Sequence, residues 1–265
     1  MDPAPSGNQS CLMTTLGGNV VVRNGNSLDF CWREAIRSLL PVCDVVSVSD
    51  GESDDGTQEE IREWMKAEPK IVLNVYPWPN PKGDPDWFVK WLNYNREHTR
   101  ADWQFQLDAD EVLHEKSYEQ IREFIQTPGQ TGVVTRHNFW LDHRHTIAEG
   151  ICLGKRVIRL APQKLWLASD GYHPKGEEAA SLGRMTGIEI FHYGFIRKPE
   201  AFFKKERLLQ NYFFDSYDPR LEAQEKNPNW MAEPSVGDYC GHLDDYSGSH
   251  PAVAQDWLRE RGYAC

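Results

Sequence analysis

The 265-residue sequence lacks long apolar runs and paired cysteines. No apolar segment approaches the about 18 residues that a membrane-spanning helix needs, and residues 1–18 contain no basic start followed by an apolar stretch. The six cysteines are scattered without a Cys-x-x-Cys pair, which argues against a zinc ribbon and is typical of reduced thiols. We therefore expect a cytoplasmic protein without a transmembrane segment.

Positive charge is also scarce. Lysine and arginine total 29 against 40 aspartate and glutamate residues, which gives a net charge of −11, and no long basic run is present. Such a chain is poorly suited to gripping a nucleic-acid backbone. Nucleic acid is therefore disfavoured as the main partner.

Several familiar motifs are missing as well. The sequence has no Gly-x-Ser-x-Gly elbow, no phosphate loop ending in Gly-Lys-Ser/Thr and no Gly-x-Gly-x-x-Gly after a strand. The loop from Asp50 to Asp54 fails as a calcium loop because Gly56 comes one position late and Ile61 stands at the twelfth position. The histidine group His137, His143 and His145 matches no standard zinc spacing.

Strand-like and helix-like segments alternate through the first half. Strands are expected at 19–23, 45–49, 71–75 and 103–107, and helices at 29–40, 57–67 and 87–100. This order predicts an α/β fold with a Rossmann-like, mostly parallel sheet flanked by helices. The later part is less regular, with helices expected at 117–126, 199–215 and 253–261 and strands at 132–135, 155–160 and 188–193.

Polar side chains follow three of the predicted strands. Arg23, Asp50 and Asp108 each come at or just past a strand end. Because ligands of open α/β sheets bind at the carboxyl ends of the strands, we expect these residues to converge. Alternation places Asp108 and Asp110 on one side, where two carboxylates suit Mg²⁺ or Mn²⁺, although a solvated strand end would have the same pattern.

Three motifs in order resemble the nucleotide-sugar half of family-2 glycosyltransferases, over roughly residues 19–113. They are Val21-Val22-Arg23-Asn24, the loop from Ser49 to Thr57, and Leu107-Asp108-Ala109-Asp110-Glu111 after the lead-in Ala101-Asp102-Trp103. Asn93 also fits the family pattern. Two weaker matches are the His-Tyr-Gly segment from Ile190 to Glu200, and Gly248-Ser249-His250-Pro251, which is similar to a Gly-x-His-Pro turn of some relatives.

The resemblance implies a metal-dependent glycosyltransferase with a GT-A fold that uses Mn²⁺ or Mg²⁺ and a nucleotide-sugar. A UDP-sugar is the favoured donor, with GDP- and dTDP-sugars as alternatives. After a lead-in at 1–18, residues 19–115 would bind the donor and 116–265 the acceptor, in one continuous domain. The implied metal ligands are Asp108, Asp110 and His192. The implied donor-binding residues are Arg23, Asn24, Asp50, Gly51, Asp54, Lys90, Asn93, Asp108, Ala109 and Arg197.

The residue chemistry fits several of these roles. Asp50 can accept hydrogen bonds from a uracil edge or a ribose, and a metal at Asp110 would stabilise the leaving diphosphate. Arg23, Lys90 and Arg197 could neutralise phosphate charge, although basic residues are often solvated surface groups.

Inverting transfer needs a carboxylate to deprotonate the acceptor. We expect Asp170, or else Glu177, to be this base. The acceptor is undetermined and could be a glycan, a lipid-linked group, a protein or a small molecule. Two alternatives remain, a sugar-nucleotide pyrophosphorylase (a nucleotidyltransferase) and a non-catalytic glycan- or nucleotide-binding module of the same fold.

Overall fold

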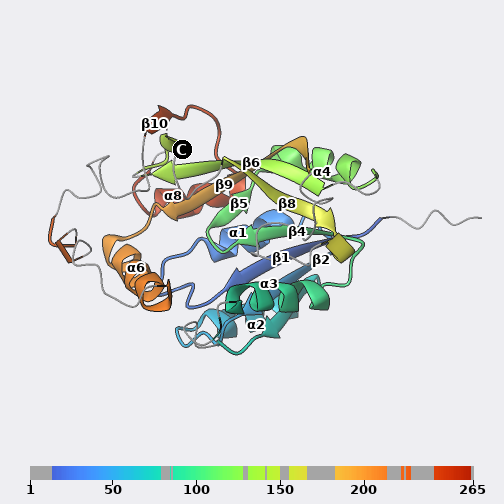
Figure 1. Ribbon diagram of the computed structural model, residues 1–265, viewed down its shortest axis with the longest axis horizontal. Helices are drawn as coiled ribbons and strands as arrows, with labels where there is room; N and C mark the ends of the chain where they lie inside the picture. Colours follow the sequence, from blue (N-terminus) through green and yellow to red (C-terminus); the bar gives the residue numbers. More distant parts are fainter. Residues whose placement is uncertain are drawn as a thin grey trace, which may run out of the picture.

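The computed structural model describes residues 14–78, 84, 86–127, 131–140, 142–149, 155–165, 183–213, 222–223, 225–227 and 242–263. In this part the chain forms an α/β fold around one mixed sheet (Figure 1). The strand order along the sheet is β10-β7-β6-β8-β4-β1-β2-β3, with β5 and β9 paired beside it.

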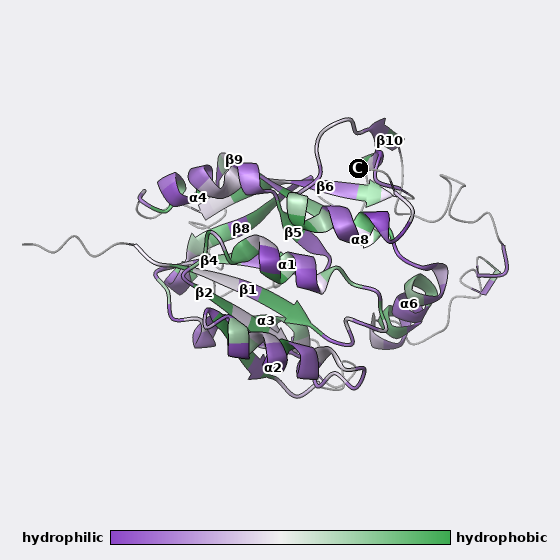
Figure 2. Cartoon of the chain, turned by 180° about the vertical axis from the view of Figure 1, so that it is seen from behind, coloured by the Kyte–Doolittle hydropathy of each residue, from purple (hydrophilic) through white to green (hydrophobic). Residues whose placement is uncertain are grey.

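The first half of the sheet is parallel and buried. It consists of β1 (Leu16–Val22), β2 (Val45–Asp50), β3 (Ile71–Val75) and β4 (Trp103–Asp108). Its helices are α1 (Trp32–Leu39), α2 (Thr57–Ala67) and α3 (Trp87–His98). Figures 1 and 2 view the sheet from opposite sides, with α3 in front in one and α1 in front in the other. The helices therefore cover both faces, as the burial of β1, β2 and β4 along their length requires.

A buried amide fastens α3 to the parallel strands. Asn95 Nδ2 donates to the backbone oxygens of Val20 at 3.2 Å and Ser47 at 3.1 Å, and its Oδ1 accepts from Ser47 Oγ at 2.6 Å. Asn95 is fully buried, so these bonds satisfy a group that would otherwise be costly to desolvate.

The second half of the sheet contains antiparallel pairs. Its strands are β5 (Glu111–Leu113), β6 (Thr131–Trp140), β7 (His145–Glu149), β8 (Arg156–Pro162), β9 (Gly183–Phe195) and β10 (His242–Asp245). Its helices are α4 (Tyr118–Phe124), α6 (Pro199–Phe213) and α8 (Gln255–Arg259), with 3-10 turns at Glu115–Ser117, Gln163–Leu165 and Ala252–Ala254. Strand β9 runs parallel to β6 and antiparallel to β5, which brings the end of β9 next to the residues that follow β4.

The α/β class predicted from the sequence is confirmed. Within the described sheet, parallel pairing joins β1, β2, β3 and β4 and also the β6–β9 pair, and the other pairs are antiparallel. The helix expected at 29–40 begins only at Trp32, because Asp29 adopts a left-handed φ of 52° that is incompatible with a helix. The first strand begins at Leu16, earlier than expected. The short strands β5, β7 and β10 were not predicted.

Two further expectations can be compared with the described part of the chain. None of its helices combines the length and apolar character needed to cross a membrane. Cys31 and Cys43 are free and buried there.

Candidate active site at the carboxyl end of the parallel strands

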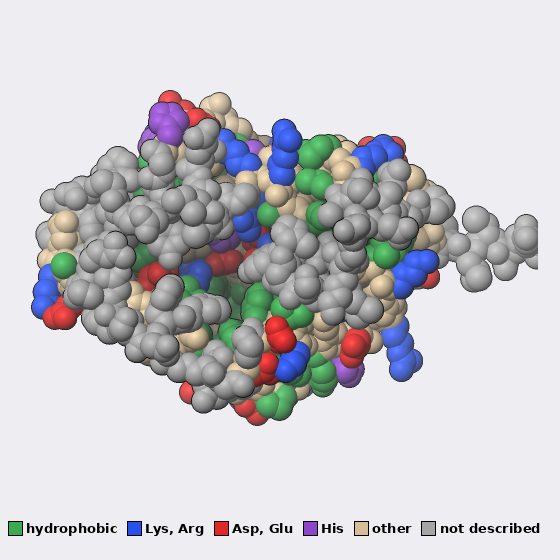
Figure 3. All heavy atoms as spheres, in the orientation of Figure 1, with side chains coloured by type: hydrophobic (Ala, Val, Ile, Leu, Met, Phe, Trp, Pro, Cys, Tyr) green, Lys and Arg blue, Asp and Glu red, His purple; other side chains and the backbone are tan. Residues whose placement is uncertain are grey.

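The ends of β1, β2 and β4 meet, as predicted. Val22 is paired with Asp50 and Val21 with Asp108 in neighbouring strands. The backbone N–H of Gly51 donates to the carbonyl of Val22 at 2.9 Å, which ties the two strand ends together. Figure 3 shows acidic and basic side chains next to one another in the middle of the molecule.

Asp110 is surrounded by basic side chains from β9 and α6. Arg197 Nη2 donates to Asp110 Oδ2 at 2.5 Å, and Lys205 Nζ donates to the same oxygen at 3.4 Å. His192 Nε2 lies 3.6 Å from Asp110 Oδ1. The ring of Phe30 lies 4.0 Å from the Arg197 guanidinium carbon and 5.5 Å from Lys205 Nζ, so both cations also have an aromatic face as partner.

These contacts set the protonation states around Asp110. Burial raises the pKa of this carboxyl, but Lys205, His192 and Arg197 outweigh burial and hold it well below its usual value. Burial lowers the pKa of His192 to about 4 despite the attraction of Asp110, so the imidazole is neutral at pH 7. Burial and Arg197 lower the pKa of Lys205.

Asp108 belongs to a second ionic group that extends to β5, β6 and β8. Arg159 Nη2 donates to Asp108 Oδ2 at 2.8 Å and to Glu111 Oε1 at 2.5 Å, and Arg136 Nη1 donates to Glu111 Oε1 at 3.2 Å. Burial raises the pKa of Asp108 to about 6 against the opposing effect of Arg159. The pKa of Glu111 is lowered, because Arg159 and Arg136 outweigh its burial.

Gly194 allows Asp110 and His192 to lie this close. A Cβ atom at Gly194 would lie 2.5 Å from His192 Nε2 and 3.0 Å from Asp110 Oδ2. The backbone N–H of Tyr193 also donates to the Asp110 carbonyl at 2.8 Å. The His-Tyr-Gly segment thus packs directly on the Asp-Ala-Asp segment.

The predicted metal ligands do not form a ready donor set in this arrangement. Asp110 already accepts bonds from Arg197 and Lys205, and Asp108 accepts from Arg159. Within the described ranges, no three His, Cys, Asp or Glu side chains are grouped closely enough to hold an ion. The residues present therefore do not fit a divalent cation without first exchanging their partners.

Asp50 is used to order the loop after β2. It is fully buried, and its Oδ1 accepts from Ser53 N at 2.8 Å and Gln58 Nε2 at 2.7 Å. Its Oδ2 accepts from Ser53 Oγ at 2.6 Å. Gly51 is required beside it, because a Cβ there would lie 2.7 Å from the Trp78 ring.

Arg23 lies between aromatic side chains at the end of β1. Its guanidinium carbon is 4.4 Å from the centre of the Trp78 ring, and Nη1 donates to Tyr212 Oη at 3.1 Å. Trp78 and Tyr212 also contact each other, with ring centres 5.5 Å apart. Helix α6 thereby reaches over the end of β1.

The remaining predicted donor-binding residues have various surroundings. The backbone N–H of Asn24 donates to Ser53 Oγ at 2.8 Å, and its Oδ1 accepts from the backbone N–H of exposed Asp54 at 3.0 Å. Ala109 is buried. Lys90 is exposed and pairs with Asp84 at 2.7 Å. Asn93 accepts a hydrogen bond from Arg96 at 3.1 Å, whereas Asn95 is the residue that bonds to the parallel strands.

The predicted bases Asp170 and Glu177 lie outside the described residues.

Sequence interpretation missed Lys205 and Arg159. A signal for Lys205 was available, because buried Ala201 and Phe202 lie four and three positions before it on α6. That spacing predicts that Lys205 faces inward and that Lys204, which is exposed, does not. Arg159 stands in an apolar strand without such a signal.

No family model and no curated protein sequence matches the chain. Among solved structures, residues 1–349 of S. aureus TarS are similar with a TM-score of 0.43 and 14% identity, covering 80% of this chain and 69% of that one. The same TarS fragment in complex with UDP gives a TM-score of 0.42 and 13% identity over the same shares. The chain spans 42% of the longer TarS structure.

A fourth similar structure is assigned as a glucose-1-phosphate thymidylyltransferase from Bacillus anthracis, solved with sucrose. It has a TM-score of 0.42 and 9% identity, covering 77% of this chain and 98% of that one. At these TM-scores the likenesses support no conclusion about activity.

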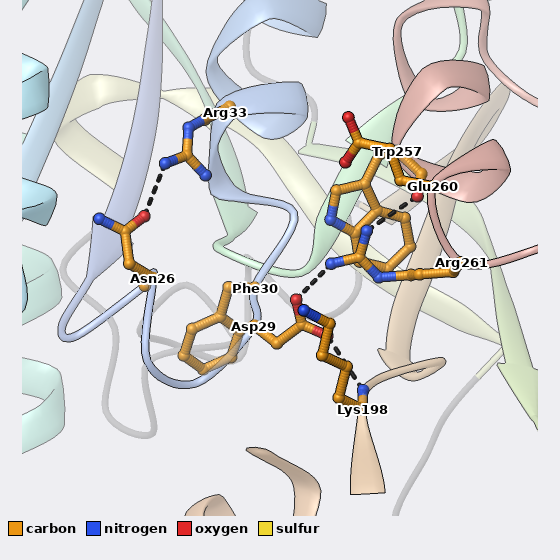
Figure 4. A pocket seen from close by; sticks show the side chains of 9 residues that line it. Asn26, Asp29, Phe30, Arg33, Lys198, Trp257, Glu260 and Arg261 are labelled. Atoms are coloured by element: carbon orange, nitrogen blue, oxygen red, sulfur yellow. Dashed lines mark hydrogen bonds and ion pairs between the residues drawn. The ribbon is translucent and has the colours of Figure 1, made fainter. Parts of the chain in front are cut away.

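A separate cavity of about 350 Å³ lies between α1, α8 and the end of β9 (Figure 4). Two of its charged side chains, Asp29 and Arg261, pair with each other. Asp29 accepts from Arg261 and from the backbone N–H of Lys198, and Arg33 donates to Asn26 and to Glu60. Phe30 lines this cavity and also contacts Arg197, so a single ring adjoins both places.

Proposed function

We propose that the protein is a glycosyltransferase of the GT-A type that transfers a sugar from a nucleotide-sugar, favouring a UDP-sugar. The observation that carries this proposal is the Asp108-Ala109-Asp110 segment at the end of β4, with buried or half-buried cations around it. The described groups there comprise four cations, Arg136, Arg159, Arg197 and Lys205, and four carboxylates, Asp108, Asp110, Glu111 and Glu206. Cations gathered at one place suit a diphosphate that replaces their carboxylate partners.

In this proposal the donor lies across the ends of β1, β2 and β4. Residues 19–115 form the nucleotide-binding half. Residues 116–265 bind the acceptor and also contribute Arg197 and Lys205 to the diphosphate. Arg197 and Lys205 exchange Asp110 for the diphosphate oxygens, and Arg23 and Trp78 border the nucleotide. The loop that Asp50 orders, from Gly51 to Asp54, supplies backbone groups near the base.

The proposed reaction is a single displacement with inversion. Asp170, or else Glu177, takes the acceptor hydroxyl proton, and the acceptor oxygen forms a bond to the anomeric carbon. The bond from that carbon to the diphosphate oxygen breaks, and the nucleoside diphosphate leaves with the electron pair. Arg197 and Lys205 stabilise the charge that develops on the leaving group.

Mn²⁺ or Mg²⁺ at Asp108, Asp110 and His192 remains part of the proposal, drawn from the sequence resemblance. The contacts around Asp110 do not support it directly, because the carboxylate is already paired with two cations. A requirement for the ion is therefore tested separately, by measuring transfer in excess EDTA.

The proposal is tested by incubating the protein with UDP-glucose, UDP-galactose, UDP-N-acetylglucosamine, GDP-mannose and dTDP-glucose and measuring the nucleoside diphosphate released. We expect release from at least one donor, and its loss in Asp110→Ala and Asp110→Asn. Asp245→Ala removes a carboxylate that is 97% exposed and serves as the control. A folded wild-type protein that releases none and binds no nucleotide would contradict the proposal.

The same experiment separates the alternatives. A nucleotidyltransferase would consume a nucleoside triphosphate and a sugar phosphate and would release pyrophosphate. A non-catalytic module would bind nucleotide without release. Both outcomes are measured in parallel reactions.

A further inference from the structure

One face of the β6–β9 pair changes from apolar to polar along its length. At one end Val134, Ile188 and Ile190 belong to the main hydrophobic core. At the other end the same face carries His192 and Asn138, which are direct neighbours in the parallel register. The polar end begins at Asp110, since His192 Nε2 lies 3.6 Å from its carboxylate.

Trp140 continues this face beyond Asn138. The pairing shifts between the two residues, and Trp140 is aligned with Phe195. The ring centres of Trp140 and Phe195 are 4.6 Å apart, and those of Phe195 and His192 are 5.6 Å apart. Phe139 lies on the opposite face, where it stacks on Phe191 and Tyr193.

The three polar side chains are buried without hydrogen-bond partners. Asn138 is 1% exposed, Trp140 2% and His192 7%. Nothing in the described part of the chain pairs with Asn138 Nδ2 or Oδ1, Trp140 Nε1 or His192 Nδ1. Buried polar atoms are almost always paired in native proteins, so four unpaired atoms on adjacent residues call for an explanation.

The chemistry of these atoms selects the kind of ligand. An anion would need donors only, and a cation would need acceptors only, whereas the Asn138 amide offers both and Trp140 adds a donor. Adjacent hydroxyls of a sugar ring both donate and accept, so they match an amide that presents both groups. The ring of Trp140 already packs on Phe195, so its contribution to a ligand is the Nε1 donor.

We propose that Asn138, Trp140 and the Nδ1 atom of His192 bind the sugar ring of the nucleotide-sugar donor. This inference rests on the proposed function. Because the transferred sugar is bonded to the diphosphate, its ring must lie next to the Asp110 group. The face meets that requirement, since His192 contacts Asp110 on one side and is the strand neighbour of Asn138 on the other.

The test compares the dissociation constants of UDP and of the UDP-sugars named above, by calorimetry on the full chain. In the wild type we expect one UDP-sugar to bind more tightly than UDP. Asn138→Leu and Trp140→Phe should reduce that advantage by about tenfold and leave UDP binding unchanged. His137→Gln alters the opposite face of β6, where His137 contacts Glu189, and should leave both constants unchanged.

Melting temperature gives a second readout. Asn138→Leu replaces an unpaired buried amide by an apolar group of similar size, so the melting temperature should stay the same or rise. If Asn138→Leu does not fold, Asn138→Ala replaces it in the test. Asn138→Ala should reduce the preference for the UDP-sugar over UDP by the same factor. A structural role for the amide would instead lower the melting temperature and leave the ratio of the two dissociation constants unchanged.

The outcomes distinguish this inference from the function on which it rests. Absence of binding of UDP and of every nucleotide-sugar named above in the wild type overturns both. Two outcomes overturn the inference alone. In one, UDP binds but no UDP-sugar binds more tightly; in the other, the advantage of a UDP-sugar persists in the Asn138 and Trp140 variants. Either outcome would mean that the Asn138 amide is hydrogen-bonded by water rather than by a sugar.

Discussion

At Asp110 one carboxylate faces two cations and a neutral imidazole. Arg197 is held in a buried site by its bond to Asp110, and half-buried Lys205 lies beside it. Fixed charges of this kind need little reorganisation when a diphosphate binds, so they favour it more strongly than solvated charges would. A lysine at this position is thus a stronger candidate for phosphate binding than exposed Lys90.

The first prediction concerns Lys205. Lys205→Met should weaken UDP binding by about 10- to 100-fold, which is the effect of losing one hydrogen bond to a charged group. Lys204→Met removes the exposed neighbour on the same helix and should leave the dissociation constant unchanged. Calorimetric titration with UDP measures both variants. If the two variants bind UDP with the same dissociation constant, Lys205 does not contact the nucleotide and the prediction is wrong.

The sequence predicted the residues that follow strand ends but not those that face them. Asp108 and Asp110 were found because strand alternation is a local property. Arg159 pairs with Asp108 across 51 positions, and that pairing depends on β8 lying next to β4. Asp50 was correctly placed at a strand end, whereas its bonds to Ser53 and Gln58 depend on the path of the loop.

At the scale of elements, β9 has the largest influence on the site. It supplies His192 and Gly194, runs beside both β5 and β6, and leads directly to Arg197. The sequence predicted only residues 188–193 of this strand. Pairing partners of a long strand are tertiary properties, and the short strands β5, β7 and β10 exist through such pairing.

A histidine links β9 to the segment before α8. The hydroxyl of Tyr193 donates to His250 Nδ1 at 2.8 Å, and His250 Nε2 donates to the carbonyl of His143 at 2.9 Å. Burial lowers the pKa of His250 to about 4. The imidazole is thus neutral when folded at pH 7, in the tautomer that these two bonds require.

The second prediction is the pH dependence of this link. Between pH 6.5 and about 4 the unfolded chain protonates His250 and the folded chain does not, so the free energy of unfolding falls as pH falls. One such group contributes at most about 1.4 kcal/mol per pH unit, and it contributes no slope above pH 6.5. The measurement is urea unfolding of the wild type and of His250→Gln over pH 4–7.5. The free energy of unfolding should fall more steeply with falling pH in the wild type than in the variant.

A matched variant shows whether this slope belongs to His250. His98→Gln replaces an exposed histidine on α3 and should keep the wild-type slope. If the free energy of unfolding depends on pH equally in the wild type and in His250→Gln, burial does not lower the pKa of His250 and the prediction is wrong.

The whole molecule carries a net charge of −11, whereas at the candidate site four cations balance four carboxylates. The site is therefore less acidic than the chain as a whole. That distribution favours anions at one place and discourages non-specific binding of polyanions elsewhere.

The third prediction follows from this distribution. UDP should raise the melting temperature even in excess EDTA, because Arg197 and Lys205 supply positive charge without an ion. At 100 times the dissociation constant the gain is about 2.7 kcal/mol, which corresponds to a rise on the order of 5 °C for a chain of this size. Thermal melts with UDP, with and without EDTA, measure it. A shift that EDTA removes entirely would show that nucleotide binding itself requires the ion.

Asp29 links the last helical segment to the centre of the molecule through a short relay. One of its carboxylate oxygens accepts from Arg261, and the other accepts from the backbone N–H of Lys198, the residue next to Arg197. Arg261 is in turn held against the ring of Trp257 at 3.6 Å. Segments more than 200 positions apart thus connect through Asp29 to the residue next to the arginine that pairs with Asp110. Under the proposed function, loosening the contact between Arg261 and Asp29 would alter donor affinity without a change at the site itself.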